Sequence, residues 1–125
     1  MLSFLLDEHM TPDVAVIVRR SRTEIPVFPL PDWQDGIWLG ESDEELLRAG
    51  GAQALTLVTD DQRTITKLLQ RWADSKQTHA GIVFVDERTI APNDLPELAR
   101  SLILFWDEHR NLDWSNRLAF LRRSS

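Results

Sequence analysis

Acidic side chains follow each of the first four hydrophobic runs of this 125-residue sequence. Clustered carboxylates repel one another unless a cation or shared protons offset their charge. Their oxygens are the ligands that Mg²⁺ and Mn²⁺ prefer, and such an ion can activate water and stabilise the charge of a phosphodiester transition state. The acids are Asp7 and Glu8 after residues 3–6, Asp43, Glu44 and Glu45 after residues 25–28 and a long loop, Asp60 and Asp61 after residues 54–59, and Asp86 and Glu87 at the end of the run that begins at residue 81.

Helix capping is the structural alternative for each of these acids. Asp and Glu near a helix N-terminus complement its macrodipole by ~0.3–1 kcal/mol, and taken singly each acid is more often a cap than a metal ligand. Asp86 is the weakest member, because the next helix starts several residues later. Asp7 is the exception, because Thr11 already provides the N-cap of the first helix and leaves Asp7 no local structural task.

Alternating strand and helix patterns must position these acids. Hydrophobic runs predict strands at 3–6, 25–28, 54–59 and 81–86, and residues 116–123 predict a fifth strand, with a short helix as the alternative. Helices are predicted from Thr11 and Pro12, from Ser42 with Glu45 as a capping box and Gly50 and Gly51 as its end, after Asp61, and over the apolar stripe from Leu95 to Trp106.

This alternation predicts an α/β fold with a mainly parallel sheet of four or five strands and helices on both faces. Pro26 favours an edge position for the second strand. The carboxyl ends of parallel strands lie at one edge of the sheet, where ligands bind in open sheets. We therefore expect Asp7, Asp61 and at least one of Asp43 and Glu44 to converge there.

The loop at 29–41 is longer than most crossover loops and carries Trp33 and Trp38. Either it packs on the body of the protein, or its tryptophans stack on nucleic-acid bases beside the acids. His9 follows Asp7 and Glu8 directly and is a further candidate for the site. The other histidines are too scattered in the sequence for a zinc site.

The composition of the chain limits the classes of function that it can have. The chain is 42% hydrophobic and 27% charged, and its length fits one domain over residues 1–125. It has no cysteine, no signal-peptide pattern and no apolar run near ~20 residues, so a cytoplasmic protein without membrane segments is expected. A net charge of -6 excludes nucleic-acid binding by overall charge, and any such role needs a local basic rim, a metal ion or a partner.

An ordered set of motifs carries a family resemblance over nearly the whole chain. They are "FLLDEHMTP", "GESDEELLRAG", "LVTDDQRT", "HAGIVFVDERTI" and "DWSNRLAFL". With these motifs the chain resembles the small bacterial PIN-like proteins of unknown function. Those proteins are relatives of the PIN-domain ribonucleases, which include many toxins of toxin–antitoxin pairs.

The resemblance implies a three-layer α/β/α fold whose acids bind Mg²⁺ or Mn²⁺ for RNA cleavage. The first acid is Asp7, the second is Asp43 or Glu44, the third is Asp61 with Asp60 adjacent, and Asp86 is a candidate for the fourth. Many relatives have a further aspartate at the position that Arg63 occupies here. The implied partners are RNA as substrate, an antitoxin protein and a second copy of the chain.

Two other functional hypotheses are alternatives to a nuclease. The first is a non-catalytic PIN-like interaction module whose acids mainly cap helices. The second is a receiver-like phosphoacceptor domain, which is disfavoured because its paired acids should follow the first strand and a lysine should follow the last.

Overall fold

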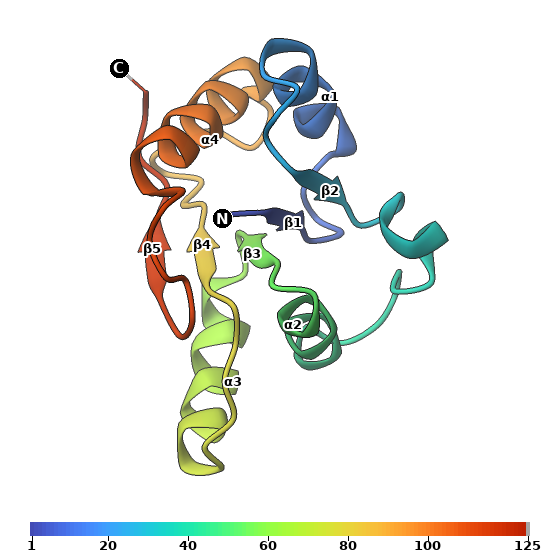
Figure 1. The fold of residues 1–125 in the computed structure, drawn as a ribbon, viewed down its shortest axis with the longest axis vertical. Helices are drawn as coiled ribbons and strands as arrows, with labels where there is room; N and C mark the ends of the chain where they lie inside the picture. The colour runs from blue at the N-terminus through green and yellow to red at the C-terminus, as the bar shows by residue number, and fades with distance from the viewer. Residues whose placement is uncertain (125) are drawn as a thin grey trace.

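The computed structural model describes residues 1–124, and these residues form five strands and four α-helices (Figure 1). The strands are β1 (Phe4–Leu6), β2 (Val27–Pro29), β3 (Thr56–Thr59), β4 (Ile82–Phe84) and β5 (Leu118–Phe120). The helices are α1 (Pro12–Ser21), α2 (Asp43–Ala52), α3 (Gln62–Asp74) and α4 (Leu95–His109), with a short 3₁₀-helix η1 (Trp33–Gly36) between β2 and α2.

All five strands pair in parallel, in the order β2-β1-β3-β4-β5. Helices α1 and α4 cover one face of the sheet, and α2 and α3 cover the other (Figure 1). The prediction of an α/β fold with a parallel sheet is therefore confirmed. Residues 118–120 form the fifth strand, so the helical alternative for that segment is wrong.

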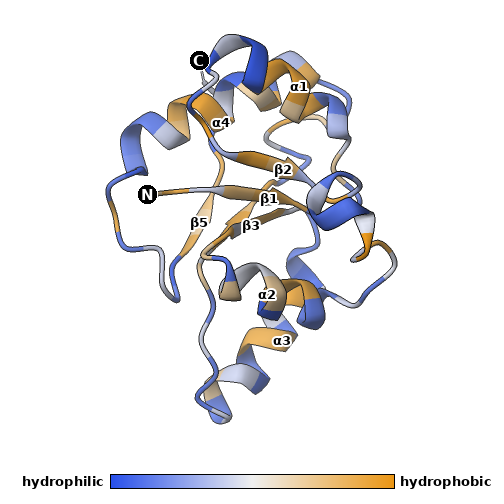
Figure 2. Cartoon of the chain, turned by 45° about the vertical axis from the view of Figure 1, so that its right-hand side comes forward, coloured by the Kyte–Doolittle hydropathy of each residue, from blue (hydrophilic) through white to orange (hydrophobic). Residues whose placement is uncertain are grey.

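The strands β1 and β4 are apolar throughout because both faces of the sheet are buried there. In β1, Phe4 and Leu6 pack with α1 and α4, while Leu5 between them packs with α2 and α3. Figure 2 shows the hydrophobic strands between helices whose outer sides are hydrophilic. No helix among residues 1–124 is both long enough and apolar enough to cross a membrane.

The predicted helix starts agree with the structure. Thr11 caps α1 by accepting from Asp13 N at 3.3 Å, and Pro12 takes the first helical position. Ser42 caps α2 by accepting from Glu45 N at 3.2 Å. The capping box is only half formed, because the Glu45 carboxylate pairs with Arg48 instead of the Ser42 backbone.

Helix α2 continues to Ala52, past the glycine pair that was predicted to end it. A Cβ on Gly50 would lie 3.2 Å from Leu5 Cδ2. This glycine therefore serves the close approach of the helix to β1, and it does not terminate the helix.

Strand β2 begins at Val27, two residues later than predicted, and lies at an edge of the sheet as Pro26 indicated. In the following loop, Trp33 is buried and stacks on Trp38 with ring centroids 6.0 Å apart. The loop packs on the body of the protein. Trp33 is a core residue, so the idea that it stacks on bases is wrong.

We expect Gly81→Ala to destabilise the fold strongly. Gly81 has φ +99°, and a Cβ there would lie 2.7 Å from the Trp114 carbonyl oxygen. Backbone strain of about 1–3 kcal/mol is then added to a clash with main chain that cannot swing away. Gly40→Ala is the matched control, because Gly40 has φ +80° and no atom within 4 Å of the added Cβ. Urea unfolding followed by tryptophan fluorescence should show a clearly larger loss for Gly81→Ala, and equal losses would contradict the clash.

Candidate functional site

The carboxyl ends of β1 and β3 lie side by side, since the two strands pair in parallel. Helix α1, which follows β1, packs on one face of the sheet, and α3, which follows β3, packs on the other. The chain therefore diverges at this point and leaves a crevice, which is where open α/β sheets bind their ligands. Asp7 follows β1 at this crevice, and Asp60 and Asp61 follow β3.

Asp7 is 2% exposed, an unusual degree of burial for a carboxylate. Its Oδ2 accepts a hydrogen bond from the Thr59 hydroxyl, and its Oδ1 accepts from His9 N at 2.9 Å. Burial raises the pKa of Asp7 above its ordinary value of 3.8, and the nearby Asp60 raises it further, although both hydrogen bonds oppose the shift. Asp7 thus holds a negative charge that its surroundings compensate only in part.

Asp61 has the structural role that the capping alternative proposed. It is the N-cap of α3, and its Oδ1 accepts from Thr64 N at 3.2 Å. Its own N–H donates to the Thr59 hydroxyl at 3.1 Å, so Thr59 links Asp61 to Asp7. The second carboxylate oxygen, Oδ2, accepts no hydrogen bond from residues 1–124 and remains free for a ligand.

Asp43, in the first turn of α2, is also affected by the charges of neighbouring carboxylates. Burial raises the pKa of Asp43, and the carboxylates of Asp61 and Glu8 raise it further, while His9 opposes the shift. His9 has the same opposing effect on the pKa of Asp7. The charge of Asp60 therefore acts on Asp7 and that of Asp61 acts on Asp43, while His9 lowers the pKa of both Asp7 and Asp43.

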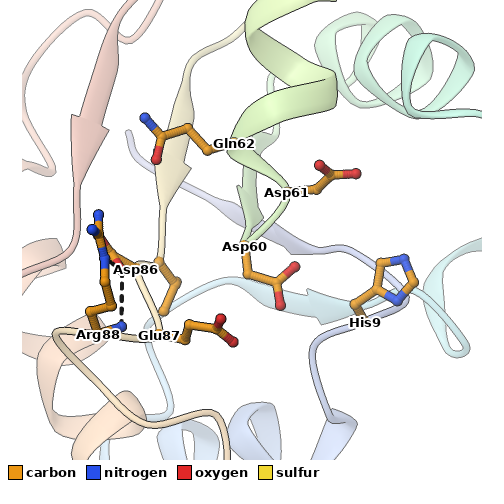
Figure 3. A pocket seen from close by; sticks show the side chains of 8 residues that line it. His9, Asp60, Asp61, Gln62, Asp86, Glu87 and Arg88 are labelled. Carbon is orange, nitrogen blue, oxygen red and sulfur yellow. Dashed lines mark hydrogen bonds and ion pairs between the residues drawn. The ribbon is translucent and has the colours of Figure 1, made fainter.

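A cavity of about 480 Å³ has acidic residues and His9 in its wall, and neither Asp7 nor Asp43 lines it. The acids that line it are Asp60, Asp61, Asp86 and Glu87. Figure 3 shows the carboxylates of Asp60 and Glu87 extending to the same side, toward the side of the picture where His9 lies. Beside it, Asp43 lines a second hollow of about 250 Å³ together with basic side chains of α3. The basic residues that line this second hollow are Arg63, Lys67 and Arg71.

Glu44 and Asp86 are engaged by arginines. Glu44 pairs with Arg48 at 3.2 Å and with Arg71 at 3.3 Å, and these bonds lower its pKa although desolvation opposes them. Arg88 folds back onto Asp86 in a bidentate pair at 2.9 and 3.1 Å, which lowers the pKa of Asp86 (Figure 3). Both acids already have counter-charges, unlike Asp7 and Asp43.

Glu97 is a second buried carboxylate of this protein, and its hydrogen bonds can be compared with those of Asp7. It is as buried as Asp7, at 2% exposed, but it accepts from Ser124 N, the Ser124 hydroxyl, Ser101 and Arg100. The bond from Ser124 N is the largest cause of a pKa lowered to about 2. The fold can therefore satisfy a buried acid, and it does not do so at Asp7.

Within residues 1–124, no three His, Asp or Glu side chains are grouped closely enough to form a ready-made metal site. The oxygens of Asp7 are directed to Thr59 and His9, and one oxygen of Asp61 is directed to its helix. An ion at this crevice would require some of these carboxylates to reorient.

Thr59 is the residue of the site that the sequence reading missed. It is a fully buried polar residue at the last position of β3, directly before the two aspartates. A polar residue that ends an apolar run just before paired acids is the signal that points to it. Glu87 and Glu8 were seen as acids in the sequence but were not assigned to the site.

Comparison of the chain with family models, curated proteins and solved structures gave no match. The resemblance to PIN-like proteins therefore stays a prediction from sequence motifs.

We expect Asp7→Asn to raise the melting temperature of the metal-free protein by a few degrees at neutral pH. The pKa of Asp7 is raised in the fold, so its ionisation destabilises the folded state as pH rises from 3.8 through the raised value. The gain from Asp7→Asn should therefore be absent below pH 3.8, where the Asp7 carboxyl is protonated in both the folded and the unfolded protein. It should grow as pH rises and reach a plateau above the raised pKa of Asp7.

Thermal melts across this pH range test the prediction, with Asp74→Asn on the exposed end of α3 as the control. A lower melting temperature for Asp7→Asn at neutral pH would show that the carboxylate mainly anchors Thr59 and His9.

We expect Asp61→Ala to cost about 1 kcal/mol of folding stability, because it removes the N-cap of α3. Asp61→Asn should cost almost nothing, because Asn is an equally good cap. Asp60→Ala is the neighbouring control, since Asp60 makes no cap bond. Urea unfolding of the three variants gives the comparison, and a cost for Asp60→Ala equal to that for Asp61→Ala would contradict the assignment of the cap.

Proposed function

We propose that this protein is a metal-dependent ribonuclease of PIN type that acts in the cytoplasm, with Mg²⁺ or Mn²⁺ held at the crevice between β1 and β3. The observation that carries the proposal is the placement of Asp7 and Asp61 after the neighbouring parallel strands β1 and β3, where both bond to Thr59. The raised pKa of Asp7 and of Asp43 is consistent with it. A protein gains nothing in stability from such a cluster, whereas a cation would relieve it.

The donor set fits a hard divalent ion. Asp43 and Asp61 would hold it, with Asp7 and Asp60 completing the ligands, and all four offer only carboxylate oxygens. Asp43 is a better ligand than Glu44, because Glu44 is already paired with two arginines. When bound, the ion supplies a water of lowered pKa as the nucleophile and stabilises charge on the phosphorus oxygens.

The chain's own residues have separate tasks in this proposal. Thr59 fixes the Asp7 carboxylate by its hydroxyl and leaves the oxygen's remaining lone pairs for a ligand. Asp61 keeps one oxygen on the first turn of α3 and offers the other. Burial of Asp7 by the ends of β1 and β3 keeps water away from one side of the site.

Basic side chains beside the acids support an RNA substrate. Arg63 and Lys67 stand one helical turn apart on α3 and form no ion pair within residues 1–124. Together with Arg71 they line the hollow that also contains Asp43. A phosphate backbone lying there would bring its phosphodiester toward the acids. These basic side chains would provide a local site for phosphate although the whole chain carries a net charge of -6.

A non-catalytic interaction module is the second candidate, and the capping bond of Asp61 favours it. In that case the acidic crevice would bind a basic segment of a partner, such as an antitoxin or a second copy of the chain. Divalent-metal binding separates the two candidates, because only the nuclease requires it.

We expect Mn²⁺ to raise the melting temperature of the wild type, since an ion that binds only the folded state stabilises it by mass action. At an ion concentration about 100 times Kd the gain is about 2.7 kcal/mol. Asp7→Asn and Asp61→Asn should lose most of this gain and all cleavage of a labelled RNA, with their folds intact. Asp74→Asn, which removes a carboxylate from the far end of α3, should keep both.

Three results would contradict the proposal of a nuclease. One is a wild type whose melting temperature does not respond to Mn²⁺. Another is RNA cleavage that survives Asp61→Asn. The third is a wild type that binds Mn²⁺ by calorimetry but cleaves no RNA, which would leave a metal site and remove the nuclease.

A further inference from the structure

The two edges of the sheet differ, and the β2 edge is closed. Phe4 N donates to Pro26 O, so residues 26 and 28 face β1 while Val27 and Pro29 face outward. Pro29 has no N–H to offer, and its carbonyl accepts from Asp32 N at 3.0 Å. The Val27 carbonyl accepts from the Arg19 guanidinium. These are devices that proteins use to keep an edge from pairing with another chain.

The β5 edge is open. Ile82 N donates to Arg117 O at 2.9 Å, and Leu121 N donates to Phe84 O at 2.8 Å. Residues 117, 119 and 121 therefore face β4, and the N–H and C=O groups of Leu118 and Phe120 point outward. None of these outward groups has a hydrogen-bond partner within residues 1–124. They form a row of unpaired groups that can accept a further strand.

A groove lies on each side of β5. The groove on the α4 side has a volume of about 500 Å³ and is lined by Leu104 and Ala119. The groove on the α3 side has a volume of about 420 Å³ and is lined by Leu69 and Leu118. Leu118 is 51% exposed and Phe120 is 49% exposed. Side chains of an added strand alternate between the two faces, so they would enter both grooves.

The surroundings of β5 are basic, although the whole chain carries a net charge of -6. Within residues 1–124 no ion pair neutralises Arg117 or Arg122, and Arg117 donates instead to the Asp113 carbonyl at 3.0 Å. Glu108 lines the groove on the α4 side, and no Asp or Glu among the described residues lines the groove on the α3 side. The basic residues in or beside the grooves are Lys76, Arg117, Arg122 and Arg123.

A second copy of the chain is a poor occupant of this edge. Two β5 strands paired antiparallel about Ala119 would set Arg117 of one copy opposite Leu121 of the other, next to Arg122. Both copies would also bring their own Arg117, Arg122 and Arg123 to one seam, where these positive charges repel one another. An acidic partner has the complementary charge.

We propose that the open edge of β5 is a docking site for an extended acidic segment of a partner protein, which adds to the sheet as a sixth strand. Backbone bonds to Leu118 and Phe120 hold the segment, as in other cases of strand addition. Its apolar side chains, on one face of the added strand, rest in the groove on the α3 side beside Leu118. Its carboxylates, on the other face, reach Arg122 and Arg123 in the groove on the α4 side.

Short synthetic peptides in which glutamate alternates with valine, isoleucine, leucine or phenylalanine test the proposal against ¹⁵N-labelled protein. Binding should slow amide exchange at Leu118 and Phe120 and leave Val27 unchanged. The same peptides with N-methyl groups on alternate residues should not bind, because they lose the backbone donors. Added salt should weaken the binding by screening the arginines.

Variants of Leu118 give the matched comparison. Leu118→Pro removes one outward N–H and leaves the bonds to β4 in place, and Leu118→Glu adds a repelling charge. Each should weaken binding by about tenfold or more, a change of ~1.4 kcal/mol. The control is Val16→Glu, which places the same charge on an equally apolar, 40% exposed position of α1.

Several results would overturn the proposal. They are the failure of every peptide to bind, equal affinities for Leu118→Glu and Val16→Glu, and protection of the Leu118 and Phe120 amides by a short single-stranded RNA but by no peptide. A concentration-dependent dimer of the wild type that Leu118→Glu abolishes would assign the edge to a second copy instead.

Discussion

The parallel pairing of β1 with β3 is the interaction on which the candidate site depends. It places the residues after both strands at one point, and the divergence of α1 and α3 to opposite faces keeps that point open. The same pairing buries Asp7, whose backbone N–H continues the ladder by donating to Val58 O at 3.1 Å. The acid therefore cannot move away from its like-charged neighbours without loss of the central strand pair, and the raised pKa of Asp7 follows from the topology of the sheet.

Two buried carboxylates in one small protein differ in how far their surroundings satisfy their charge. Glu97 is surrounded by donors, its pKa falls to about 2, and its charge is an integral part of the native state at neutral pH. Asp7 has two donors and faces Asp60, and its pKa shifts in the opposite direction. A group whose ionisation opposes folding persists more readily where a bound cation, present when the protein works, reverses the balance.

Local signals in the sequence were sufficient to predict where the helices begin. Thr11 and Ser42 cap their helices as predicted, because capping involves only three or four neighbouring residues. The approach of Asp7 and Asp61 to each other, close enough for both to bond to Thr59, also agrees with strand direction alone. The strand order could not be read locally, nor could the pairing of Asp86 with Arg88, which depends on how a long side chain folds back. Gly50 was mistaken for a helix end because its close contact with Leu5 joins segments far apart in the chain.

The unequal protection of the two sheet edges follows from their sequences. A proline at an edge costs nothing when its missing N–H would have faced solvent, and Pro29 occupies such a position in β2. Strand β5 has no proline, and its outward-facing residues are leucine and phenylalanine, which add apolar surface to unpaired backbone groups. Its shortness and the arginines around it limit pairing between identical copies, and the same arginines attract an acidic strand. Protection against self-association and selection of a partner therefore arise here from one set of charges.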